Sequence, residues 1–216
     1  MMAARTIHLR RPPTLSLQEG PFVPQPRAGV DVMDEVDRRW GAMRAANPMF
    51  HDGRICHVLG VHRNGHGGVV IHVMDCAYRF HAVQDAEFDL GVRHLGVKAM
   101  TSHDGRLLLG RRSSTVRAYP GMWEFAPGGV IEPERAPADV LKLELHEETG
   151  LRLAGEPKAI AVIFDPVVRC WEIIYQLDVA DPNPRPATDE YTELRWCEPG
   201  QWPQPLSPAT VQLINL

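Results

Sequence analysis

Cysteine is scarce in this chain, and the sequence contains no long apolar run. No two cysteines have the Cys-x-x-Cys spacing, which argues against the usual zinc and redox motifs, and the cysteines are too few for a disulfide scaffold. We therefore expect reduced thiols in a cytoplasmic protein. No apolar run approaches the length of about 18 residues that a membrane-spanning helix needs. The cysteines are Cys56, Cys76, Cys170 and Cys197.

Charge of one sign is not in large excess either. The 216 residues include 23 Lys and Arg and 27 Asp and Glu, which gives a formal net charge of −4. No strong overall field attracts nucleic acid or an acidic membrane surface, and we expect neither as a partner. Apolar residues make up 44% of the chain, so the chain can bury the core of one domain, with or without a small second one.

The first half of the chain changes composition near residue 29. Residues 1–28 are rich in proline and are predicted to form an extended, loosely packed arm. Residues 29–90 are predicted to form a small α+β module that begins with a helix after Asp31, because apolar residues there recur at steps of three and four. Strands are expected to follow at residues 55–62, 69–75 and 77–84.

Residues 91–216 are predicted to form the main domain. Asp104-Gly105 is typical of a tight hairpin turn. Gly150 stands where a helix over residues 136–149 would need a C-cap. Further strands are expected at residues 159–164, 172–179 and 193–197, with a short helix after Ser207.

The predicted helix of residues 136–149 carries a group of acidic residues near its C-terminal end. Glu144, Glu147 and Glu148 have the spacing i, i+3, i+4, so their carboxylates share one helix face. Like charges on one face repel, and the helix dipole disfavours anions at this end. A divalent cation that prefers oxygen ligands, such as Mg²⁺, would relieve both effects. A solvated acidic face is the alternative.

The stretch of residues 128–151 resembles the Nudix box, G-x5-E-x7-R-E-U-x-E-E-x-G-U, where U is a bulky aliphatic residue. Aligned without gaps, Gly129 takes the first glycine, and the tail E-U-x-E-E-x-G-U is complete from Glu144 onward. The resemblance covers the predicted domain of residues 91–216. It implies the α/β fold of Nudix hydrolases, an α/β/α sandwich, joined here to the small N-terminal α+β module.

Two positions depart from the Nudix pattern. Arg135 stands at the first glutamate, and Leu143 stands at the arginine. In the family that arginine helps to orient the neighbouring glutamate, which Leu143 cannot do because it has no hydrogen-bond donor. These losses leave open a catalytically silent Nudix module that binds a nucleotide or a protein.

Resemblance to Nudix enzymes implies metal-assisted hydrolysis of a nucleoside diphosphate linked to another group. The implied cofactor is Mg²⁺, with Mn²⁺ as an alternative. The resemblance also implies catalytic and metal-binding roles for Glu144, Glu147 and Glu148, with the Gly129 carbonyl beside them. The general base varies within the family, and downstream candidates are Glu172, Glu190 and Glu193.

Arginines crowd the segment before the box, and guanidinium groups fit phosphate oxygens bidentately. We predict substrate contact for Arg112, which resembles a common Nudix feature after the second strand, and for Arg111. Arg135 is a third candidate because it supplies positive charge where relatives have a carboxylate. Its alternative is an ion pair with Glu132 or Glu134.

Trp40 and the later residues 47–54 (Asn-Pro-Met-Phe-His-Asp-Gly-Arg) are similar to a motif, W…NP-x-F-x-G, that precedes the Nudix domain in one divergent branch. That branch includes UDP-glucose and UDP-galactose diphosphatases. The resemblance therefore implies release of a nucleoside monophosphate and a sugar 1-phosphate. Alternative substrates are a dinucleoside polyphosphate and a dinucleotide cofactor. Trp40 and Phe50 also fit a role in the core of the small module.

Overall fold

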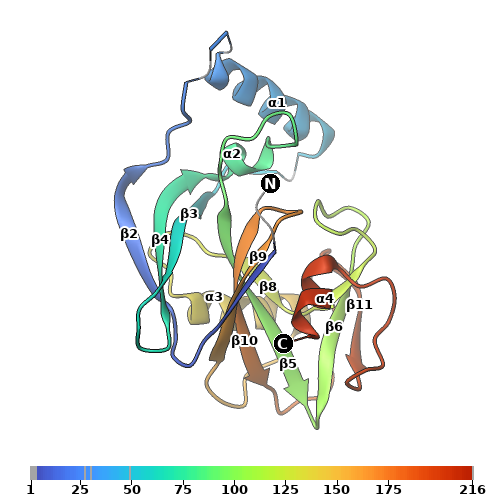
Figure 1. Ribbon diagram of the computed structural model, residues 1–216. Helices are drawn as coiled ribbons and strands as arrows, with labels where there is room; N and C mark the ends of the chain where they lie inside the picture. Colours follow the sequence, from blue (N-terminus) through green and yellow to red (C-terminus); the bar gives the residue numbers. More distant parts are fainter. Residues whose placement is uncertain (1–3, 27, 30, 49, 216) are drawn as a thin grey trace.

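The computed structural model describes residues 4–26, 28–29, 31–48 and 50–215 (Figure 1). Residues 1–3 and 27 of the predicted arm lie outside the described residues. So do residue 30 of the predicted module, Met49 of the 47–54 motif and residue 216.

Short strands outnumber helices along the chain. The strands are β1 (Arg5–His8), β2 (Thr14–Pro21), β3 (Arg54–Arg63), β4 (Val69–Ala77), β5 (His94–His103), β6 (Arg106–Arg112), β7 (Trp123–Phe125), β8 (Gly128–Val130), β9 (Lys158–Asp165), β10 (Cys170–Asp178) and β11 (Tyr191–Cys197). The helices are α1 (Val32–Ala46), α2 (Tyr78–Ala82), α3 (Pro137–Thr149) and α4 (Pro208–Leu213). Within the described ranges, none of these helices has both the length and the apolar content of a bilayer span.

The strands form one mixed sheet with β5 near its centre. The main order is β1-β9-β10-β5-β3-β4-β2; β6 and β8 also pair with β5, while β7 and β11 pair with β6. β10 runs parallel to β5 from Cys170↔His94 to Asp178↔Ser102. The short β8 pairs antiparallel with β5 from Gly96↔Val130 to Lys98↔Gly128. β5 therefore lies between the glycine-rich β8 and the long β10.

Helices cover both faces of this sheet, which confirms the predicted α/β/α sandwich. Successive side chains of a strand point to opposite faces. On β9, Phe164 packs in the same core cluster as Leu145 of α3. Its neighbour Ile163 packs in a different cluster, together with Leu213 of α4. α3 and α4 thus lie on opposite faces of the sheet (Figure 1).

The other two helices gather at one end of the sheet (Figure 1). Their apolar side chains form a separate core cluster, in which Trp40 of α1 and Phe80 of α2 are buried. Trp40 also packs near Phe50, with ring centroids 6.3 Å apart. The aromatic residues of the predicted N-terminal motif therefore fill a local core.

Several local predictions are confirmed. Asp31 caps α1, since its Oδ1 accepts the N–H groups of Met33 at 3.0 Å and Asp34 at 3.1 Å. α3 ends at Gly150, whose φ of +69° is the left-handed conformation that glycine adopts easily. Asp104-Gly105 joins β5 to β6, and both residues have positive φ, as a two-residue hairpin turn requires.

The described part of residues 1–28 includes two extended strands, but these are not the loosely packed arm that was predicted. β1 pairs antiparallel with β9, and β2 pairs parallel with β4. Ile7 is only 3% exposed and belongs to the main core. Proline does not prevent this pairing, because within the strands it occurs only as Pro21, the last residue of the edge strand β2, where a missing N–H is tolerated.

The strand predicted at residues 77–84 is also wrong, because this stretch contains α2. The N–H of Arg79 in the first turn of α2 donates to the carboxylate of Asp52 at 2.9 Å. This helix-capping interaction comes from a residue far away in the sequence, so a local pattern cannot reveal it. The helix buries Phe80 and Ala82 in the local core.

The domain boundary predicted near residue 90 is not marked by a break in the sheet. β3 pairs with β5 at His57↔His94. The N-terminal residues and the main domain therefore share hydrogen-bonded strands. The division into residues 29–90 and 91–216 stays a prediction.

Candidate functional site

β8 and α3 meet so closely that Gly129 has no room for a side chain. A Cβ built on Gly129 would lie 2.5 Å from Cγ of Glu144, well inside van der Waals contact. The glycine thus allows the helix to bring the Glu144 side chain directly against the strand. This contact brings together the glycine segment and the acidic helix of the stretch that resembles the Nudix box, residues 128–151.

Glu148 is fixed at the same strand. Its Oε2 accepts a hydrogen bond of 3.1 Å from the N–H of Gly128, and the residue is only 2% exposed. Glu144 is partly buried, whereas Glu147 is exposed on the outer side of the helix. The structure therefore brings Glu144 and Glu148 to Gly128 and Gly129, the double glycine of β8. It leaves Glu147 in solvent.

The carbonyl groups of the double glycine point in opposite directions. The Gly129 oxygen faces β5, because a Cβ on Gly96 would lie 3.0 Å from it. The N–H of Gly128 points to Glu148, and in a strand the N–H and C=O of one residue face the same edge. This geometry favours Gly128 as the backbone oxygen beside the carboxylates, rather than Gly129, whose carbonyl was predicted there.

The two carboxylates lie in surroundings that disfavour their charge. Burial raises the pKa of Glu148 well above its ordinary value, and repulsion from Glu190 and Glu144 raises it further. Burial likewise raises the pKa of Glu144 from 4.5 to about 7, with additional repulsion from Glu190 and Glu147. Acidic groups thus lie close together here, in surroundings that favour their neutral forms in the absence of a cation.

These residues fit a hard divalent cation in their chemistry. Carboxylate and carbonyl oxygens are the ligands that Mg²⁺ prefers, and positive charge would offset the repulsion between Glu144 and Glu148. As the side chains stand, no group of three or more His, Cys, Asp or Glu residues in the described ranges is arranged to hold an ion. Glu144 and Glu148 would therefore need backbone oxygen, water or substrate to complete a coordination sphere.

A second polar group lies in the interior beside β5. Lys98 is 5% exposed, and its Nζ lies 3.0 Å from Glu124 and 3.9 Å from Glu172. Burial alone would lower the pKa of Lys98, but the two carboxylates raise it above its ordinary value. Lys98 also lies next to the double glycine, because a Cβ on Gly128 would be 3.1 Å from its Nζ. The buried lysine therefore borders the candidate site.

Lys98 and Glu124 were not predicted as residues of the site. The signal for Lys98 was present, since it is the one charged residue in the apolar stretch 95–101. A charged residue there must find a partner when the strand is buried. Nothing in the sequence identified Glu124 as that partner.

The predicted substrate-binding arginines differ in their surroundings. Arg112 is partly buried beside the site, with Nη1 2.9 Å from Glu190 and 3.4 Å from Glu124. Arg111 is exposed and donates to a backbone carbonyl at 3.4 Å. Arg135 is exposed and forms the alternative ion pair, with Glu132 at 3.1 Å. The structure thus brings only Arg112 close to the carboxylates.

The three candidates for the general base are also distinct. Glu190 acts electrostatically on both Glu144 and Glu148. Glu172 is partly buried beside Lys98, and its buried Oε2 has no hydrogen-bond partner among the described residues. Glu193 pairs with Arg195 on the exposed part of β11. Glu190 and Glu172 are therefore the two candidates that lie near the double glycine.

Comparison with known proteins agrees with this architecture. A family model described as the NUDIX domain matches residues 92–215. An uncharacterized Nudix hydrolase of Pseudomonas aeruginosa is 33% identical over 96 residues, which is 44% of this chain and 56% of that protein. The CTP pyrophosphohydrolase of Escherichia coli is 32% identical over 120 residues, which is 55% of this chain and 87% of that protein.

Solved structures include a similar fold. The crystal structure of a MutT Nudix hydrolase from Burkholderia pseudomallei is 25% identical to this chain, with a TM-score of 0.50, and the match covers 56% of this chain and 95% of that one. The chain spans just over half the length of the Pseudomonas relative. Because the family model matches more than half of the residues and includes β8 and α3, this chain belongs to the Nudix hydrolase family.

Proposed function

We propose that the protein hydrolyses the diphosphate of a nucleoside diphosphate sugar of the UDP-glucose kind. The products would be a nucleoside monophosphate and a sugar 1-phosphate, and the cofactor would be Mg²⁺, with Mn²⁺ as an alternative. The observation that carries the proposal is the convergence of Glu144 and Glu148 on the double glycine. Nudix family membership supports hydrolysis of a nucleotide derivative in general.

Each residue of the site has a defined task in this proposal. Glu144 and Glu148 would hold the divalent cation together with the Gly128 carbonyl. When bound, the cation supplies positive charge to the diphosphate oxygens and favours deprotonation of water. Arg112 would contribute positive charge toward the phosphates from its place beside Glu190. Arg111 and Arg135 remain predicted contacts with the substrate, but the geometry supports them less than it supports Arg112.

The reaction needs a proton acceptor near the attacked phosphorus. Glu190 is the preferred candidate because its charge acts on both Glu144 and Glu148. Its carboxylate would accept a proton from water while the water oxygen forms a bond to phosphorus. The bond between that phosphorus and the bridging oxygen then breaks, and the second phosphate group leaves with the bridging oxygen.

The preference for a sugar rests on the resemblance of Trp40 and residues 47–54 to the UDP-sugar diphosphatase branch. The packing of Trp40 against Phe50 shows a structural role for two residues of that motif. A second candidate function is hydrolysis of a nucleoside triphosphate. It is favoured by the similarity to the Escherichia coli protein named CTP pyrophosphohydrolase.

The four cysteines are free and buried, and we propose the cytoplasm as the location of the protein. Its proposed partner is the small-molecule substrate, and we propose neither nucleic acid nor a membrane as a partner.

A substrate panel tests the proposed function. The panel contains UDP-glucose, CTP, a dinucleoside polyphosphate and NAD⁺, each incubated with Mg²⁺ or Mn²⁺, and the products are separated by chromatography. UMP plus glucose 1-phosphate supports our proposal, and CMP plus diphosphate supports the second candidate. The variant Glu148→Gln should lose cleavage while keeping its fold, because glutamine can still accept the N–H of Gly128. Cleavage of no member would instead favour a silent binding module.

A further inference from the structure

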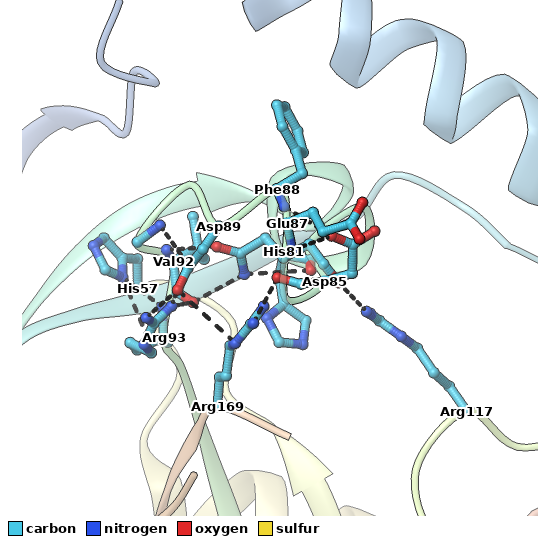
Figure 2. A network of polar contacts seen from close by, with 12 residues as sticks. His57, His81, Asp85, Glu87, Phe88, Asp89, Val92, Arg93, Arg117 and Arg169 are labelled. Carbon is cyan, nitrogen blue, oxygen red and sulfur yellow. Dashed lines mark hydrogen bonds and ion pairs between the residues drawn. The ribbon is translucent and has the colours of Figure 1, made fainter. Parts of the chain in front are cut away.

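Four segments bring basic side chains together beside the first residues of β5. His81 belongs to α2 and His94 is the first residue of β5, whereas Arg117 comes from the connection between β6 and β7 and Arg169 from the turn between β9 and β10. Figure 2 shows Arg117 and Arg169 approaching the segment around Asp85 from two sides, with His81 between them. The segments belong to both the N-terminal region and the part that matches the Nudix family.

The two histidines have polar atoms without partners. Their ring centroids are 4.2 Å apart, with an angle of 65° between the ring planes. Nδ1 of His81 and Nδ1 of His94 are both buried, and neither has a hydrogen-bond partner among the described residues. His81 is only 8% exposed. Leaving a buried polar atom unpaired costs about 1–3 kcal/mol, so such atoms often mark a place that a ligand or water completes.

The groups that act electrostatically on His81 are a second histidine and three arginines. Burial lowers the pKa of His81 well below its ordinary value, and His94, Arg117, Arg169 and Arg93 lower it further. Burial also lowers the pKa of His94 to about 4. Both imidazoles are therefore neutral near neutral pH, and each can donate one N–H to an anion.

The acidic side chains nearby already have arginine partners. Asp89 accepts hydrogen bonds from both terminal nitrogens of Arg93, at 2.9 and 2.8 Å, and Asp85 pairs with Arg39. Arg117, by contrast, is exposed and donates to a backbone carbonyl at 3.3 Å. Its guanidinium has five N–H groups, so it keeps donors for a ligand. Arg169 donates to the backbone carbonyl of Asp85 at 2.6 Å and lies 4.0 Å from the carboxylate of Asp89, and its remaining N–H groups are also donors for a ligand.

This basic cluster lies on the same face of the sheet as Lys98. His94, Gly96 and Lys98 are alternate residues of β5, so their side-chain positions face the same way. Gly96 lies beside Gly129, and Lys98 lies beside Gly128. At about 3.3 Å per residue, His94 is about 13 Å along the strand from Lys98. A nucleoside diphosphate derivative held at the double glycine could extend over this distance.

We propose that His81, His94, Arg117 and Arg169 form a subsite for an anionic group of the substrate, remote from the diphosphate that is cleaved. The group is a carboxylate or a phosphate monoester, because arginine pairs with both in the same forked geometry. The inference rests on the proposed function, since it requires a diphosphate bound at the double glycine. A metal is disfavoured as the occupant, because no third His, Cys, Asp or Glu in the described ranges joins the histidine pair to hold one.

Two matched pairs of compounds test the subsite. UDP-glucuronate differs from UDP-glucose by a carboxylate, and NADP⁺ differs from NAD⁺ by a phosphate monoester. We expect kcat/KM of the wild-type protein to be at least about tenfold higher for the charged member of one pair, which corresponds to about 1.4 kcal/mol. Preference in the sugar pair identifies a carboxylate as the ligand, and preference in the dinucleotide pair identifies a phosphate.

The variant Arg117→Ala tests which residues cause that preference. Arg117 is exposed, so its truncation should leave the fold intact, and we expect the ratio between charged and neutral members to fall at least about fivefold. The control is Arg63→Ala, which removes an exposed arginine at the end of β3 and should keep the wild-type ratio. An unchanged ratio in Arg117→Ala would overturn the assignment.

Binding measurements separate failure of the subsite from failure of the proposed function. If the wild-type protein cleaves both members of each pair with equal efficiency, the subsite is refuted and the diphosphatase activity stands. If it cleaves none of them, calorimetry with the same four compounds decides the matter. Tighter binding of a charged member that Arg117→Ala abolishes supports the subsite without hydrolysis, and equal affinities within both pairs refute it.

Discussion

Glu148 and Gly128 are joined by a hydrogen bond of 3.1 Å from the glycine N–H to the carboxylate Oε2. The bond connects the last turn of α3 to β8 and holds a carboxylate that is 2% exposed. Burial raises the pKa of Glu148, and the Gly128 N–H acts in the opposite direction by favouring the charged form. The interaction therefore positions the carboxylate and helps to keep it available as a ligand.

Replacement of Gly129 by alanine should displace Glu144. The new Cβ would lie 2.5 Å from Cγ of Glu144, so the carboxylate must leave the strand. We expect cleavage to fall at least about tenfold, because small displacements of catalytic groups have large effects on rate. The control is Gly155→Ala, since a Cβ at Gly155 meets nothing within 4 Å. Equal initial rates for the two variants would show that Glu144 does not need this position.

Replacement of Lys98 by methionine should destabilise the fold. Lys98 lies 3.0 Å from Glu124 in the interior, and its loss leaves a buried carboxylate without its closest cation. Breaking a buried ion pair from one side typically costs about 3–5 kcal/mol, which urea unfolding can measure. The double variant Lys98→Met, Glu124→Gln should recover part of this loss. A double variant less stable than the single one would count against the pairing.

In the absence of divalent cations, stability should depend on pH through the acidic pair. The pKa of Glu144 is raised from 4.5 to about 7 in the folded chain, and that of Glu148 is raised as well. The folded protein therefore binds these protons more tightly than the unfolded chain. The resulting stability is fully present below about pH 4.5 and is lost as the pH rises through about 7.

Thermal unfolding in a chelator can follow this effect. The wild-type Tm should fall more steeply between about pH 5 and pH 7 than the Tm of the double variant Glu144→Gln, Glu148→Gln. Titration of all other groups is common to both proteins, so the difference isolates the pair. Parallel pH profiles would show that the pair contributes no linkage.

The acidic cluster and its helix could be predicted from the sequence because their signals are local. The spacing of Glu144 and Glu148 places both on one face of a helix. Gly150 marks the end of that helix, where the structure shows a left-handed residue. The hairpin turn at Asp104-Gly105 could likewise be predicted from its local sequence. These features depend on neighbours within a few residues.

The features that were missed depend on contacts between distant segments. Asp52 caps α2 from outside the helix, and Lys98 of β5 pairs with Glu124 of β7. The strand β1, near the N-terminus, pairs with β9, which lies about 150 residues later in the sequence. Periodicity reports only which faces are apolar, so it could not reveal these partners or show that Gly128 rather than Gly129 turns toward Glu148.

Calorimetric titration with Mg²⁺ and Mn²⁺ tests the central claim that Glu144 and Glu148 hold a divalent cation. The proteins to compare are the wild type, Glu148→Gln and the control Glu156→Gln, which neutralises an exposed glutamate away from β8. We predict that the wild type and the control bind the ion and that Glu148→Gln binds it at least about tenfold more weakly, a difference of about 1.4 kcal/mol. Absence of ion binding by the wild type, even with UDP-glucose present, or equal affinity in Glu148→Gln, would contradict the claim.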